Sequence, residues 1–232
     1  MNADNEAGRG ALVVLVGPDN AGKSSVLREL RRLRPDWPSG SIDPADLLPL
    51  PGLDYLNFAL ETHPRVFCEP MGPLGRTSWF VHMLSLLYEY RLLPELDRGR
   101  LVIADSLHYR VRAKEELLGS PGAAVLEALG RQLPRPDLVV WLDVPLETAW
   151  RRGGESCKYY EAMGELTWEG YRRMQEGVRE LVLNRYVDGI PIRLVDGSPP
   201  VDAVAGQIVR VVEEVAGPKV GPMKQLAGGV RR

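Results

Sequence analysis

The feature that most constrains this chain is a run of residues bracketed by glycines, directly after an apolar stretch. The run reads Gly17, Pro18, Asp19, Asn20, Ala21, Gly22, Lys23, Ser24 and Ser25, and it fits the phosphate-binding pattern G-x-x-x-x-G-K-[ST] without a gap. Glycines let backbone N–H groups approach phosphate oxygens, and the following helix points its N-terminus at the same anion. Lys23 can reach the β- and γ-phosphates of ATP, and Ser24 can ligate Mg²⁺. The run therefore predicts a P-loop whose residues contact Mg-ATP.

Short apolar runs that read as strands alternate along the chain with helical patterns. The predicted strands are residues 11–16, 65–68, 101–104, 138–142 and 192–195. The predicted helices are 23–33, 78–96 with a kink near Pro94, 115–129 as one helix or two, 145–152, 167–186 and 201–215. Continuously apolar strands are typical of a sheet that is covered on both faces. We therefore expect an α/β fold with a five-stranded parallel sheet and helices on both faces.

Composition limits both the domain organisation and the class of protein. We expect a flexible N-terminus over residues 1–9, one domain over 10–216 and a flexible tail over 217–232, with a loop at 35–51. The formal net charge of −2 disfavours a general nucleic-acid binder. Two cysteines make no disulfide framework, and no Cys/His spacing indicates zinc. The sequence shows no signal peptide and no apolar run near the roughly 20 residues of a membrane span, so we expect a cytoplasmic protein without membrane contact.

Carboxylates end two of the predicted strands. Asp105 and Asp143 follow apolar runs, and ligands bind at this edge in open α/β sheets. Either can hold Mg²⁺ through water; we favour Asp105, because Asp143 precedes Val-Pro and reads equally well as a loop cap. His108 lies just beyond Asp105, where it can orient an acceptor hydroxyl or phosphate. The alternative for His108 is a solvated loop side chain.

These motifs, in this order, resemble thymidylate kinases and their nucleoside monophosphate kinase relatives. The resemblance rests on Asp19 inside the P-loop, Glu69-Pro70, Asp105, and the segment PDLVVWLDVPLETAWRR at residues 136–152. It covers roughly residues 12 to 215. The resemblance implies a P-loop NTPase fold of the nucleoside monophosphate kinase type.

The resemblance also implies roles for single residues on the acceptor side. Asp19 would approach the acceptor sugar and the metal shell. Glu69, Asp105 and Arg91 match family residues near the acceptor nucleotide. Tyr88 lies beside the position of an aromatic residue that stacks on the base.

On the ATP side, the resemblance implies that Lys23 stabilises the transferring phosphoryl group. Arg151 and Arg152 open a lid over approximately residues 152–167, with Gly153-Gly154 as its hinge. Lid arginines would close over ATP and exclude water. A solvated helix end is the alternative reading for this arginine pair.

The departures from the family pattern all fall on the acceptor side. Ser106 stands where the family has an arginine after Asp105, and Arg110 and Arg112 are the candidates to replace it. Leu87 stands where the family has a phenylalanine. The acceptor, the oligomeric state, the role of the tail, and the effect of Ser106 on specificity or activity therefore stay open.

The resemblance implies an ATP-dependent kinase, a transferase that moves a phosphoryl group to a nucleoside monophosphate, with dTMP as the leading acceptor. One alternative is a kinase of the same fold acting on a nucleoside, sugar or secondary-metabolite hydroxyl. Another is a regulatory module that binds ATP without catalysis. A homodimer through the apolar face of residues 78–96 is a further expectation, and packing of that face on the sheet is its alternative.

Overall fold

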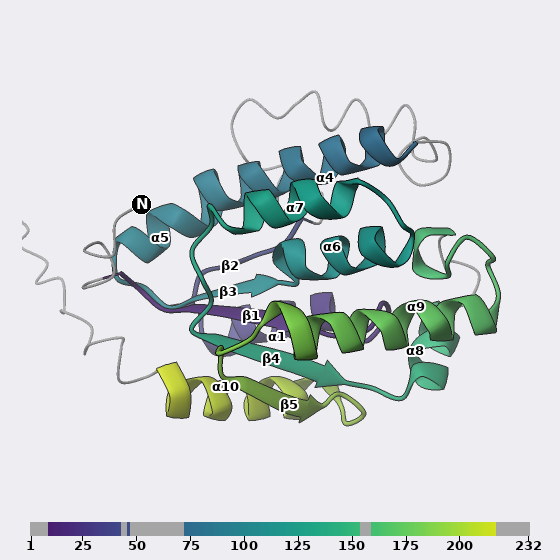
Figure 1. The fold of residues 1–232 in the computed structure, drawn as a ribbon. Coiled ribbons are helices and arrows are strands. Elements are labelled where there is room, and N and C mark those ends of the chain that lie inside the picture. The colour runs from purple at the N-terminus through teal and green to yellow at the C-terminus, as the bar shows by residue number, and fades with distance from the viewer. Residues whose placement is uncertain (1–8, 43–45, 47–71, 154–158, 217–232) are drawn as a thin grey trace, which may run out of the picture.

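A five-stranded parallel sheet runs through the middle of the molecule, and helices cover both of its faces (Figure 1). This computed structural model describes residues 9–42, 46, 72–153 and 159–216. The strands are β1 (Leu12–Val16), β2 (Ser39–Gly40), β3 (Val102–Asp105), β4 (Leu138–Asp143) and β5 (Ile192–Asp196), in the spatial order β2-β3-β1-β4-β5. The predicted α/β class is therefore confirmed.

Strand β1 occupies the centre of the sheet because all of its residues are apolar and buried. It pairs with β3 on one side and with β4 on the other, so the strand order reverses at β1. Ligands of open α/β sheets bind in the crevice at the carboxyl edge, where this reversal occurs. The loop that follows β1 therefore lies where this fold offers a binding crevice.

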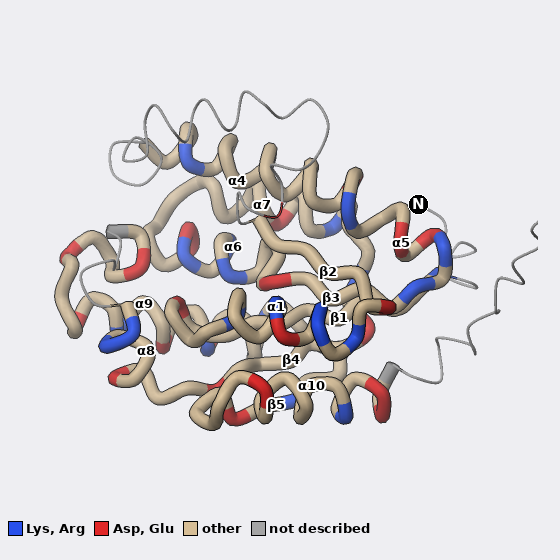
Figure 2. Tube along the Cα trace, turned by 180° about the vertical axis from the view of Figure 1, so that it is seen from behind, with Lys and Arg blue, Asp and Glu red and all other residues tan. Residues whose placement is uncertain are grey.

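The helices form two layers that take alternate residues of β1 into separate cores. Val13 and Leu15 share a core with α1 (Lys23–Leu33), α8 (Leu146–Gly153) and α10 (Val201–Ala216); Figure 2 shows α1 and α10 from this side. Leu12, Val14 and Val16 share the other core with α4 (Pro73–Leu87), α6 (Leu107–Leu117) and α9 (Trp168–Leu181). Helix α7 (Gly122–Gly130) packs on α4 and α6. The alternation explains why β1 reads as continuously apolar.

The second strand of the sheet differs from the prediction. Residues Ser39–Gly40 pair with Ile103 and Ala104 of β3, inside the stretch 35–51 that was expected to be loop. A strand of two residues has no alternating pattern, so sequence periodicity could not reveal it. The strand predicted at residues 65–68 lies outside the described residues.

Several helix boundaries also differ from the predictions. The helix predicted at 78–96 begins at Pro73 and passes through a π-helical turn (Tyr88–Leu92) into α5 (Leu93–Asp97). Pro94 has no N–H for an α-helical bond, which agrees with an irregularity at this point. The segment predicted at 115–129 forms two helices, and the first already begins at Leu107. Helix α9 continues in a π-helical turn (Val182–Tyr186). Across the described ranges, no helix is both long and apolar enough to cross a membrane.

Candidate active site

The P-loop joins β1 to α1 with the backbone geometry that its glycines permit. Gly22 has φ of 94° at the start of α1, a value that L side chains rarely adopt. A Cβ on Gly17 would lie 2.7 Å from the carbonyl oxygen of Leu142 in β4. Alanine at either position would therefore strain the loop or displace it from the sheet.

Lys23 is buried at the first position of α1 and folds back over the loop. Its Nζ donates to the carbonyl oxygens of Gly17 at 3.1 Å and Pro18 at 2.5 Å. Burial, and then the neighbouring Arg110, lower the pKa of Lys23 to about 8. The ammonium group is thus held inside the loop that would receive phosphates.

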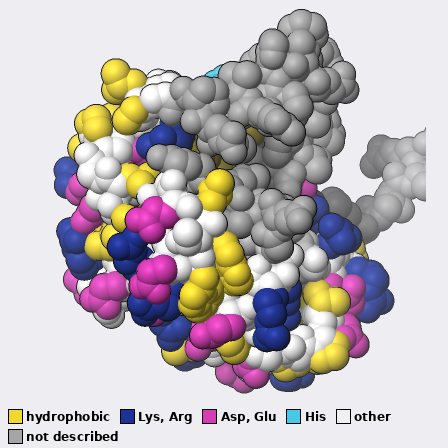
Figure 3. Space-filling model, turned by 90° about the vertical axis from the view of Figure 1, so that its right-hand side faces the viewer, with side chains coloured by type: hydrophobic (Ala, Val, Ile, Leu, Met, Phe, Trp, Pro, Cys, Tyr) yellow, Lys and Arg dark blue, Asp and Glu magenta, His cyan; other side chains and the backbone are white. Residues whose placement is uncertain are grey.

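A cavity of about 560 Å³ opens at the carboxyl edge of β1 and β3. Figure 3 views the molecule from the side at which the strands end, where basic and acidic side chains intermingle on the surface. Most residues of the P-loop line this cavity, and other elements complete it: Asp19, Asn20, Gly22, Lys23, Ser24, Ser25, Ser41, Ile42, Asp105, Arg110, Arg152 and Glu161. We refer to it below as the cleft. The fold therefore brings the P-loop, Asp105 and a lid arginine to one place.

A second cavity of about 480 Å³ borders the cleft, and Gly22, Ser25 and Arg152 line both. Its other walls are residues 197–201 after β5, with Ala21, Val26 and Val204. The combined space thus passes from a polar end to a more apolar one.

Asp19 is held by side chains from two helices. Its carboxylate accepts from Arg110 at 2.9 Å on Oδ1, and from Lys114 at 2.6 Å and Gln175 at 2.9 Å on Oδ2. Its backbone N–H donates to Gln175 Oε1 at 2.9 Å, and its carbonyl oxygen accepts from the Tyr171 hydroxyl at 2.6 Å. Helices α6 and α9 therefore fix the middle of the P-loop.

The charges around Asp19 decide its ionisation. Burial raises the pKa of this carboxyl group, but Lys114, Arg110 and Lys23 together hold it well below its usual range. Asp19 is consequently an anion at neutral pH although only 4% of it is exposed. It can accept hydrogen bonds but cannot donate a proton.

Asp105 closes β3 beside the P-loop and accepts a hydrogen bond from the Ser106 hydroxyl. Ser106 and Leu107 have φ of 52° and 43°, a strained backbone of the kind that gathers at functional sites. Asp143, the alternative metal carboxylate, instead pairs with Arg179 and lines a separate cavity. Of the two candidates, only Asp105 faces the cleft.

The two lid arginines separate. Arg152 lines the cleft and donates to the Ala21 carbonyl oxygen at 3.2 Å. Arg151 is exposed and donates along its own helix to Glu147. Gly153 packs on the P-loop, since a Cβ there would lie 2.5 Å from Nδ2 of Asn20. Close approach is therefore one reason for glycine at this position.

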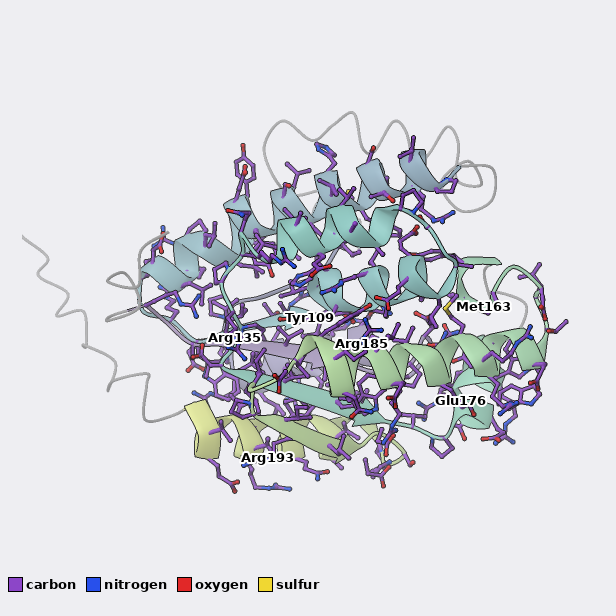
Figure 4. The ribbon with its side chains drawn as sticks, viewed as in Figure 1. Tyr109, Arg135, Met163, Glu176, Arg185 and Arg193 are labelled. Carbon is purple, nitrogen blue, oxygen red and sulfur yellow. The ribbon has the colours of Figure 1, made fainter. Side chains whose placement is uncertain are left out.

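Two residues expected near the acceptor are buried between elements of the fold. Tyr88 is 1% exposed in the core between α4 and the sheet. His108 packs against α7, where a Cβ on Gly130 would lie 2.4 Å from its Nε2. Figure 4 shows Tyr109, the neighbour of His108, close to Arg135 and far from Met163 of the lid. Neither Tyr88 nor His108 lines the cleft as the described residues form it, and their role in substrate binding stays a prediction. The sequence around each residue does not show whether its side chain is buried or faces a binding site.

The remaining acceptor-side residues are also set apart. Arg91 donates to the carbonyl oxygen of Asp46 at 3.2 Å and lines a different cavity. Glu69 lies outside the described residues, as do residues 154–158 of the lid.

Of the residues that hold Asp19, sequence reasoning named Arg110 as a candidate phosphate ligand but missed Lys114, Gln175 and Tyr171. Arg110 and Lys114 are four residues apart, a spacing that places both on one face of a helix, and this spacing could have identified the pair. Gln175 and Tyr171 lie in the middle of α9 and have no local motif. Glu161 joins the cleft from a short 3₁₀ helix (Tyr159–Glu161).

Comparison with known proteins shows the family to which this chain belongs. No family model matches the chain. The chain is 31% identical over 203 residues to a thymidylate kinase of Alkalilimnicola ehrlichii, covering 84% of this chain and 89% of that protein. It is 30% identical over 200 residues to a thymidylate kinase of a Synechococcus species, covering 80% and 89%. It is 27% identical over 216 residues to a probable thymidylate kinase of Staphylothermus marinus, covering 88% and 96%. With its P-loop, its parallel sheet and these relatives along most of its length, the chain belongs to the thymidylate kinase family.

Proposed function

We propose that this chain transfers the γ-phosphoryl group of Mg-ATP to dTMP, yielding dTDP and ADP. The observation that carries the proposal is the cleft, where Lys23 and Ser24 of the P-loop face Asp105 and Arg110 across one cavity. The names of the relatives support dTMP as the acceptor. Phosphoryl transfer needs positioning and charge stabilisation more than covalent chemistry, and the cleft offers both.

In the reaction, an oxygen of the dTMP phosphate forms a bond to the γ-phosphorus. The bond between the γ-phosphorus and the β,γ-bridging oxygen breaks, and its electron pair leaves with ADP. Negative charge spreads over the transferring group and the leaving oxygen. Lys23, which is already inside the P-loop, would stabilise both. Asp19 would orient the acceptor by accepting a hydrogen bond, because its charge state excludes donation.

The residues of the cleft fit a magnesium ion. Ser24 and Asp105 offer a hydroxyl and a carboxylate, the oxygen ligands that Mg²⁺ prefers. Among the described residues, no group of three His, Cys, Asp or Glu side chains forms a metal cage. Mg²⁺ in kinases is held by one or two protein oxygens, with phosphate oxygens and waters supplying the rest. When bound, Mg²⁺ would neutralise phosphate charge, and Ser24 and Asp105 would hold it.

The two neighbouring cavities suggest how ATP would lie. The phosphates would occupy the P-loop end of the cleft, and the base and sugar would extend past Arg152 toward residues 197–201. Arg152 lines both cavities, so its guanidinium can follow the phosphate chain. Arginine suits this place because its planar fork binds phosphate oxygens in pairs.

The described end of the lid, around Tyr160, lies against α4 and α6. Tyr160 stacks on Phe80 of α4 with ring centroids 5.5 Å apart, and its hydroxyl donates to the Val111 carbonyl oxygen at 3.2 Å. The Nζ of Lys114 lies 4.7 Å from the same ring. A lid that closes over ATP from this anchored end would exclude water during transfer.

The test is ATP consumption against a panel of acceptors: the common nucleoside monophosphates, their nucleosides and several sugars. We expect turnover with dTMP well above all others and its loss in Lys23→Met. Turnover with an unphosphorylated acceptor alone would contradict a monophosphate kinase. ATP binding without turnover on any acceptor would contradict a kinase of these substrates.

A further inference from the structure

The cleft holds few cations for the charge that it must accommodate. A nucleoside monophosphate brings about two negative charges at neutral pH, and these must approach a phosphorylated second substrate. Among the described lining residues, the cations are Lys23, Arg110 and Arg152. Lys23 and Arg152 both donate to P-loop carbonyl oxygens, so they serve the ATP end. Of these three described cations, Arg110 is the one left to serve the acceptor end.

Arg110 lies in the first turns of α6, the helix that begins directly after Asp105 and Ser106. Ser106 gives no positive charge, and its hydroxyl is engaged with Asp105. The guanidinium of Arg110 instead reaches into the cleft and meets Oδ1 of Asp19 at 2.9 Å. The N-terminus of α6 opens at the same edge of the sheet and adds positive potential for an anion.

We infer that Arg110 binds the phosphate of the acceptor nucleotide by exchanging its contact with Asp19, while Lys114 keeps Asp19 in position. This inference rests on the proposed function and identifies the residue that recognises the acceptor as a phosphorylated molecule.

The contacts of Asp19 make this exchange feasible. Its Oδ2 stays bound to Lys114 at 2.6 Å and to Gln175 at 2.9 Å when Arg110 leaves. The carboxylate therefore remains neutralised, and its Oδ1 becomes free to accept a hydrogen bond from the acceptor. Lys114 is 4% exposed and does not line the cleft, so its charge is reserved for Asp19. Arg110 and Lys114, four residues apart on α6, thus have different tasks: Arg110 binds the acceptor phosphate, and Lys114 holds Asp19.

Arg112, the other candidate to replace the missing family arginine, serves a different surface. It pairs with Glu127 at 3.1 Å and lies 3.9 Å from the ring centre of Tyr186. Its side chain is 18% exposed against 20% for Arg110. Because the two arginines share a helix and a degree of burial but face different partners, Arg112 is a matched control.

The experiment measures the dissociation constants of dTMP and thymidine by calorimetry for the wild type, Arg110→Gln, Arg110→Lys and Arg112→Gln. The dissociation constant of thymidine divided by that of dTMP isolates the contribution of the phosphate to affinity. We expect Arg110→Gln to reduce this ratio by roughly ten- to a hundredfold, the range for a lost charge-assisted hydrogen bond. Arg110→Lys should recover part of it, and Arg112→Gln should leave it within about twofold of wild type.

Turnover separates this inference from the function on which it rests. In Arg110→Gln, KM for dTMP should rise while KM for ATP stays unchanged. A wild-type chain that does not phosphorylate dTMP would overturn the proposed function together with the inference. An active wild type with an unchanged ratio in a folded Arg110→Gln would overturn the inference alone. If Arg110→Gln does not fold, Arg110→Lys decides, since an unchanged ratio there would exclude recognition by the arginine fork.

Discussion

Replacing Lys114 with methionine should destabilise the fold although the new side chain has a similar length. Lys114 and Asp19 are each 4% exposed, and their charged atoms are 2.6 Å apart. Methionine would keep most of the packing but would leave a buried carboxylate with one cation fewer. The variant therefore isolates the electrostatic part of the contact between α6 and the P-loop.

The size of the effect follows from what remains around Asp19. Breaking a buried ion pair costs about 3–5 kcal/mol when the other charge is left without compensation. Here Arg110 and Gln175 still bond the carboxylate, so we expect the lower end, about 3 kcal/mol. At an m-value of about 2 kcal/mol/M, this lowers the urea midpoint by about 1.5 M.

Urea unfolding followed by tryptophan fluorescence measures this loss. Asp19→Asn alone and together with Lys114→Met completes a double-mutant cycle, in which we expect the second substitution to cost much less than in the wild type. Arg185→Met is the control, because its pair with Glu116 is exposed and should be worth less than about 1 kcal/mol. A loss below about 0.5 kcal/mol in Lys114→Met, or an equal loss with and without Asp19, would refute the reasoning.

Three further outcomes follow from burial and close contact. Since Lys23 has a pKa of about 8, ATP affinity measured by titration should fall between pH 8 and 9.5 as the ammonium deprotonates; a flat profile would contradict this. Burial, and then Arg112, lower the pKa of His108 to about 4, so the unfolded chain binds more protons as the pH falls from about 6.5 to 4. The free energy of unfolding, measured with urea, should therefore drop more steeply with acid in the wild type than in His108→Phe, by up to about 3 kcal/mol at pH 4. Gly130→Ala should cost about 1–3 kcal/mol by overpacking, whereas Gly206→Ala, with no neighbouring atoms within 4 Å, should be neutral or stabilising in the same measurement.

Most strands, helix α1 and the P-loop could be predicted because a short stretch of sequence determines each of them. Strands β1, β3 and β4 coincide with continuously apolar runs, and β5 with a run that Arg193 interrupts; all four begin and end within one residue of the predictions. Helix α1 matches its predicted bounds, residues 23–33, because Gly22 and the apolar spacing after it mark its start. The P-loop was readable for the same reason: its glycines and Lys23 act through the backbone of one short segment.

The parts of the site that could not be predicted depend on contacts between residues far apart in the sequence. Asp19 is separated from Arg110 by 91 positions and from Gln175 by 156, and no pattern connects such distant residues. Tyr88 and His108 looked like site residues because they neighbour functional positions in the chain. On a helix, however, adjacent residues point in different directions, so proximity in sequence does not place a side chain in the cleft.

The central claim is that the chain moves one phosphoryl group from ATP to dTMP. Chromatography of a reaction with Mg-ATP and dTMP, sampled over time, tests it most directly. The account predicts equal amounts of dTDP and ADP, with neither formed by Lys23→Met. ADP formed without dTDP, or formed at the same rate without dTMP, would contradict it.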